Sequence, residues 1–91
     1  MNSEQTLPCV LVIDDDITVR LIAERNLQKN DFKAILAANG VEGIELFNEF
    51  SIDVILLDYE MPGLSGLDTC RTLRHQLINC EVPILMITGK D

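Results

Sequence analysis

Acidic side chains follow two separate apolar runs of this sequence. Asp14, Asp15 and Asp16 come directly after the first run, and Asp58 ends a later one. Two carboxylates about 4 Å apart repel by roughly 4 kcal/mol at an effective dielectric constant near 20, so a cluster of them favours a bound cation. Mg²⁺ prefers hard oxygen ligands of this kind. These residue types therefore allow three roles: ligands for a cation, nucleophiles toward phosphorus, or solvated turn residues.

Strand-like and helix-like patterns alternate along the chain and must position these acids. Short β-branched runs predict strands, and apolar residues at three- and four-residue steps predict helices. The predicted strands are Cys9–Ile13, Lys33–Ala38, Ile52–Asp58 and Val82–Thr88, and the predicted helices are Ile17 to about Lys29, Gly40–Phe50 and Gly66 to about Leu77. This alternation indicates an α/β fold with a parallel sheet between helices.

The carboxyl ends of parallel strands meet at one edge of a sheet, where ligands bind. Asp14 and Asp15 follow the first predicted strand, Asp58 ends the third, and Thr88 ends the fourth. We therefore expect these side chains to lie together in a functional site. Taken singly, each acid is also explained as a helix N-cap or an exposed turn residue, and Asp16 or Thr18 suits the N-cap of the first helix.

Composition limits the remaining possibilities. Ninety-one residues make one domain, and a hydrophobic content of 47% favours a globular fold. A net charge of −8 argues against binding nucleic acid or an anionic membrane through this surface. Three cysteines without CxxC spacing favour reduced thiols, and neither a signal peptide nor a membrane-spanning run is present. These features predict a cytoplasmic protein.

Three segments carry a family resemblance. The sequence VLVIDDD, then VILLDYEMPGLSGLD, then PILMITGK resembles the receiver domain of bacterial two-component response regulators. The resemblance extends from Cys9 onward and leaves residues 1–8 as a polar tail. It implies a flavodoxin-like three-layer fold and a signalling domain rather than an enzyme. It also implies that Asp58 accepts a phosphoryl group from a sensor histidine kinase or a phosphotransfer protein.

The same resemblance implies roles for individual residues. Asp15 and Asp58 match direct ligands of Mg²⁺, for which Mn²⁺ can substitute, and the backbone carbonyl of Glu60 matches the third protein ligand. Asp14 matches the other member of the acid pair and acts on the metal indirectly. Thr88 matches the hydroxyl that contacts the phosphoryl group and switches conformation.

Two alternatives remain open at this point. Asp14, Asp16 and Thr18 also fit the DxDxT pattern of haloacid-dehalogenase-like phosphatases, in which Asp14 would be the nucleophile and Asp16 the acid/base. The chain could instead be an interaction module on the receiver fold that works without phosphorylation. The phosphorylated residue distinguishes these functions.

The resemblance also implies that the chain is truncated after its fourth strand. The family's fourth helix, fifth strand and fifth helix would be absent, together with a lysine that follows the fifth strand. Lys90 follows the fourth strand, so we do not assign that role to it. An apolar edge strand and part of an apolar stripe on the first helix would then be exposed, and we expect a homodimer or a larger assembly.

Overall fold

Four parallel strands form one sheet with the order β2-β1-β3-β4 in the computed structural model. The structure describes residues 7–58, 61, 65–76 and 82–87. The elements are β1 (Cys9–Ile13), α1 (Ile17–Lys29), β2 (Lys33–Ala37), α2 (Gly40–Glu49), β3 (Val54–Asp58), α3 (Gly66–Gln76) and β4 (Ile84–Ile87). The predicted parallel α/β fold is therefore confirmed, and the described strand ends match the predicted bounds to within two residues.

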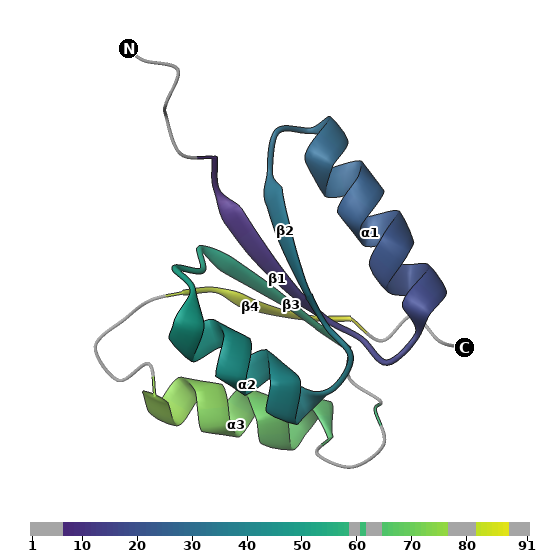
Figure 1. Cartoon of the computed structure of the whole chain (residues 1–91). Helices are drawn as coiled ribbons and strands as arrows, with labels where there is room; N and C mark the ends of the chain where they lie inside the picture. The colour runs from purple at the N-terminus through teal and green to yellow at the C-terminus, as the bar shows by residue number, and fades with distance from the viewer. Residues whose placement is uncertain (1–6, 59–60, 62–64, 77–81, 88–91) are drawn as a thin grey trace.

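Helices cover the two faces of the sheet unequally (Figure 1). α1 lies on one face against β1 and β2, while α2 and α3 lie side by side on the other. Every residue of β1 is buried, as expected for a strand covered on both faces. The largest fully buried apolar side chains are Leu11, Ile13, Ile55, Leu57 and Leu73. The core therefore rests on aliphatic residues of the two central strands and α3.

Two polar caps fix where α1 and α2 begin. The Asp16 carboxylate accepts a hydrogen bond from the Thr18 amide at 2.9 Å, which confirms Asp16 as the N-cap of α1. Asn39 caps α2 by accepting from the Glu42 amide at 2.8 Å. The Glu42 carboxylate in turn accepts from the Ala38 amide at 2.7 Å, which makes a reciprocal capping arrangement. Both helices therefore start directly after the strands that precede them.

Some apolar residues on or next to the described helices are exposed. Leu67 of α3 is exposed, whereas the next turn buries Thr69 and Leu73. Thr69 is buried without cost to its hydroxyl, which donates to the Ser65 carbonyl at 2.8 Å. Phe50 is exposed because it ends α2 with an extended backbone and leaves the helix face. Among the residues that the structure describes, no helix has the length and apolarity needed to cross a bilayer.

Candidate functional site

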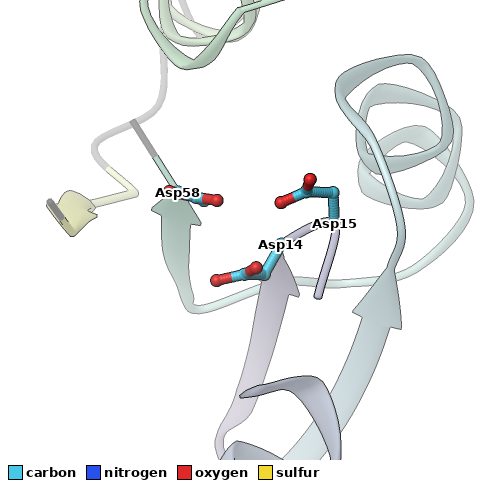
Figure 2. A group of neighbouring side chains, drawn as sticks. All are labelled: Asp14, Asp15 and Asp58. Carbon is cyan, nitrogen blue, oxygen red and sulfur yellow. The ribbon is translucent and has the colours of Figure 1, made fainter. Parts of the chain in front are cut away.

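The sheet register places Asp14 and Asp58 side by side. Ile13 of β1 pairs with Leu57 of β3, so the next residue of each strand, Asp14 or Asp58, lies at the same edge of the sheet. Asp15 follows in the turn that leads to α1. Figure 2 shows the three carboxylates around one space beyond the ends of β1 and β3. One oxygen from each of the three lies within 4.8 Å of the others.

The cluster combines buried and exposed acids. Asp14 is 6% exposed and Asp58 is 3% exposed, whereas Asp15 is open to solvent. Two carboxylates about 5 Å apart repel by about 3 kcal/mol at an effective dielectric constant near 20, and solvent weakens the repulsion that involves Asp15. A cation between the three groups would offset this repulsion.

Backbone contacts hold Asp14 in the turn between β1 and α1. Its amide donates to the Ala37 carbonyl at 3.1 Å, which continues the pairing of β1 with β2. Its carboxylate Oδ1 accepts from the Asp16 amide at 2.9 Å. Its carbonyl accepts from the Arg20 guanidinium at 2.8 Å. Asp14 is therefore fixed through its amide, its carbonyl and its side chain.

The spacing of the three acids fits a hydrated divalent cation. Mg²⁺ binds oxygen at about 2.1 Å, so two opposite ligands lie about 4.2 Å apart. Separations of up to 4.8 Å exceed that span, which suits a set in which one carboxylate binds through water. Mg²⁺ commonly retains several waters in proteins. The oxygen-only donor set and its spacing therefore fit Mg²⁺ or Mn²⁺.

Other predicted site residues lie outside the described part of the chain. These are Glu60 and Thr88. Ile87, the residue before Thr88, is described and pairs with Asp58 in the β3–β4 ladder. His75 is exposed on α3, away from the described acids.

Arg20 is the residue near this site that the sequence analysis missed. It stands on α1, four residues after the N-cap Asp16, and its side chain returns to the Asp14 carbonyl. Side chains on a helix lean toward its N-terminus, so a long basic residue in the first turn can reach the preceding loop. The position of Arg20, four residues after Asp16, was therefore the feature of the sequence that could have indicated this contact.

Comparison with known proteins identifies the family. Residues 10–91 match the response regulator receiver domain family. The chain belongs to this family. The receiver domain extends over nearly the whole chain, and its four-stranded sheet between α1 and the α2–α3 layer is the flavodoxin-like arrangement that the sequence predicted. It is a domain of two-component signalling proteins.

This chain matches different shares of the length of its relatives. Response regulator MprA of a Mycobacterium species (strain KMS) is 40% identical over 82 residues, which are 90% of this chain and 35% of MprA. The chain thus spans about a third of the length of that curated relative. The chemotaxis protein CheY4 of Vibrio cholerae has a structure with a TM-score of 0.88 and 30% identity, covering 94% of this chain and 72% of CheY4.

A third relative has been solved in two complexes. The response regulator TrrA of Thermotoga maritima in complex with histidine kinase ThkA has a TM-score of 0.83 and 29% identity, covering 93% of this chain and 72% of TrrA. TrrA in complex with Mg²⁺-BeF has a TM-score of 0.81 and 30% identity, covering 91% of this chain and 72% of TrrA. Both complexes are those of TrrA.

Proposed function

We propose that this receiver domain accepts a phosphoryl group on Asp58 from a phosphohistidine of a sensor histidine kinase or a phosphotransfer protein, in the cytoplasm and with Mg²⁺. The observation that carries the proposal is the cluster of Asp14, Asp15 and Asp58 at the carboxyl edge of β1 and β3. The TrrA complexes with a histidine kinase and with Mg²⁺-BeF support both the partner and the metal.

In this proposal Asp58 acts as the nucleophile. Its carboxylate is nearly buried at the end of β3 and faces the space that it shares with Asp15. One carboxylate oxygen attacks phosphorus, the P–N bond to histidine breaks, and the electron pair stays on the imidazole nitrogen, which takes up a proton. The product is an aspartyl phosphate. A low exposure of Asp58 excludes much of the water that would compete with this transfer.

The neighbouring residues support the transfer in distinct ways. Asp15 and Asp58 would hold Mg²⁺ directly and Asp14 would hold it through water, with the Glu60 carbonyl as a further ligand. Bound there, Mg²⁺ would offset the negative charge on the phosphoryl oxygens. Thr88 would contact the phosphoryl group and reorient toward it. Its predecessor Ile87 pairs with Asp58, which supports that assignment.

The first experiment maps the phosphorylated residue. The full chain is incubated with acetyl phosphate and Mg²⁺, the acyl phosphate is reduced with borohydride, and the modified residue is located by mass spectrometry. We expect the label on Asp58 and its loss in Asp58→Asn. Asp31→Asn is the matched control, because Asp31 has a φ of 65° that asparagine adopts readily.

Other outcomes would point to other functions. A label on Asp14 would favour the phosphatase alternative, although Asp16, its acid/base in that scheme, caps α1 in this structure. If neither acetyl phosphate nor a phosphohistidine protein labels any aspartate, the interaction module that works without phosphorylation is the better description.

A further inference from the structure

Arg20 binds the peptide group that joins two acids of the cluster. Its guanidinium Nη1 donates to the carbonyl oxygen of Asp14 at 2.8 Å. That carbonyl belongs to the peptide between Asp14 and Asp15, so its direction determines how the two side chains leave the backbone. Arg20 is half-buried, and its own amide donates to the Asp16 carbonyl at 3.0 Å as α1 begins. The side chain thus extends from the hydrogen-bonded first turn of α1.

The rest of the turn is held by bonds on either side of this peptide. The Asp14 amide is bound to the Ala37 carbonyl, and the Asp16 amide is bound to the Asp14 carboxylate. Asp15 lies between these anchors and is exposed to solvent. The contact from Arg20 to the Asp14 carbonyl therefore adds a restraint on the backbone immediately before Asp15.

We propose that Arg20 is a positioning residue for the cation site: it holds the Asp14–Asp15 peptide so that both carboxylates face Asp58. The proposal rests on the proposed function for its cation, and on the Arg20 contact for its geometry. Arg20 acts through the backbone and is not itself a ligand, because a guanidinium is a cation that donates hydrogen bonds only.

The charge of Arg20 and its contact have opposite effects on cation binding. A positive charge next to the site repels a second cation, so removal of the charge alone would tighten binding. Loss of the contact frees the peptide, spreads the carboxylates over more arrangements and weakens binding. Partners that orient metal ligands commonly contribute 10- to 100-fold in affinity. The sign of the change therefore separates a positioning role from a purely electrostatic one.

The test compares Mg²⁺ affinity across three variants of the full chain. We expect Arg20→Ala to weaken Mg²⁺ binding by about tenfold. Arg20→Lys should recover part of the loss, since an ammonium group also donates to a carbonyl but lacks the planar fork. Arg25→Ala is the matched control: it removes the same charge from an exposed position on the same helix, and should leave affinity within about twofold. Unchanged or tighter binding in Arg20→Ala would overturn the proposal.

A second measurement works without metal and separates this proposal from the proposed function. Amide hydrogen exchange reports the Asp16 amide, which donates to the Asp14 carboxylate. We expect faster exchange of Asp16 in Arg20→Ala and unchanged exchange of the buried strand residue Val12, which shows that the fold is intact. Equal exchange of Asp16 in both proteins would refute the positioning role. Failure of the wild-type chain to bind Mg²⁺ would count against the proposed function, and the exchange rates would still decide the role of Arg20.

Discussion

Asp15 and Asp16 are adjacent and chemically identical, yet the fold gives them different tasks. Asp15 contributes an oxygen to the cluster with Asp14 and Asp58. Asp16 instead accepts the Thr18 amide and begins α1. Substitutions of Asp15 and of Asp16 can therefore distinguish a metal ligand from a negative charge that is only near the metal.

We predict that Asp15→Ala weakens Mg²⁺ or Mn²⁺ binding more than any other single change in the acid run. The site loses an oxygen ligand and part of its negative charge, so the dissociation constant should rise at least about tenfold, or about 1.4 kcal/mol. Asp16→Asn is the control, because asparagine retains the N-cap oxygen and removes only a neighbouring charge. Equal affinity of wild type and Asp15→Ala in a titration would show that Asp15 is not a ligand.

A second residue-scale prediction concerns Cys9 at the start of β1. Burial raises the pKa of its thiol above the ordinary value, the Lys33 ammonium partly offsets that effect, and the Asp53 carboxylate adds to it. An unfolded thiol has a pKa of about 8.5. As the pH rises above that value, the unfolded chain releases a proton that the folded chain retains. The thiol's contribution to stability is therefore fully present below pH 8.5 and is lost as the pH rises toward the folded pKa.

The measurement is urea unfolding under reducing conditions between pH 7 and pH 10. The unfolding free energy of the wild type should fall with pH more steeply than that of Cys9→Ala, by at most about 1.4 kcal/mol per pH unit. The comparison cancels the other groups that titrate in this range. Parallel curves for the two proteins would mean that the Cys9 thiol titrates alike in both states.

The sequence predicted which acids form the cluster, but it could not predict the hydrogen bond from Arg20 that holds the backbone between two of them. Asp14 and Asp58 were predicted to meet because parallel strands end at one edge, and the structure brings them together. Their roles in metal binding and phosphoryl transfer remain proposals. The Arg20 contact depends on where one long, flexible side chain points, and apolar periodicity carries no information about that.

At the scale of elements, α2 approaches β1 closely at Gly43. A β-carbon on Gly43 would overlap the side chain of Ile13, with Cγ1 at 2.8 Å and Cδ1 closer still. Ile13 is fully buried at the end of β1, directly before Asp14. The packing of α2 on β1 therefore affects the end of β1, which is followed directly by Asp14.

We predict that Gly43→Ala destabilises the fold by about 1–3 kcal/mol through overpacking, despite the higher helix propensity of alanine. Ile13→Val removes the δ-methyl that the new β-carbon meets. The double variant should therefore be more stable than the sum of the two single changes predicts, which a double-mutant cycle in urea detects. Additive effects would show that the added methyl is accommodated elsewhere.

The sequence predicted where the helices and strands lie. It was a poorer guide to which residues of each helix are buried. Within the described residues, apolar steps of three and four residues predicted the helices α1, α2 and α3, and short apolar runs predicted the strands β1 to β4. Leu67 is exposed, and α3 instead buries the face that contains Thr69 and Leu73. Which face of a helix is buried depends on its neighbours, and a residue's own hydropathy records this only in part.

At the scale of the whole molecule, the two sides of the sheet differ in their apolar exposure. β4 lies at the edge of the described sheet, and its Leu85 and Ile87 are exposed on the face opposite the core-packed Ile84 and Met86. Because α2 and α3 cover the core side, these two residues share the α1 side of the sheet. The exposed apolar residues of α1 are Ile17, Val19, Leu21 and Ile22. Two apolar surfaces on separate elements are thus open to solvent.

We predict that the 91-residue chain associates into a dimer or a larger assembly through these surfaces. Leu85 is 54% exposed and Ile22 is 56% exposed. Burial of even ~400 Å² of apolar surface would contribute on the order of 10 kcal/mol before the cost of association is subtracted. An apolar edge strand without a charged side chain is also open to pairing with a second copy.

Sedimentation at micromolar concentration tests this prediction. Single substitutions by charged residues show which surface forms the contact between copies. Leu85→Lys should shift the chain toward monomer if the copies pair through β4, and Ile22→Glu should do so if they cover α1. Val41→Glu is the matched control, because Val41 is equally exposed but lies on α2, on the other side of the sheet. A well-folded wild-type monomer at that concentration would refute the prediction, since exposed apolar area alone would then be insufficient to offset the entropy lost on association.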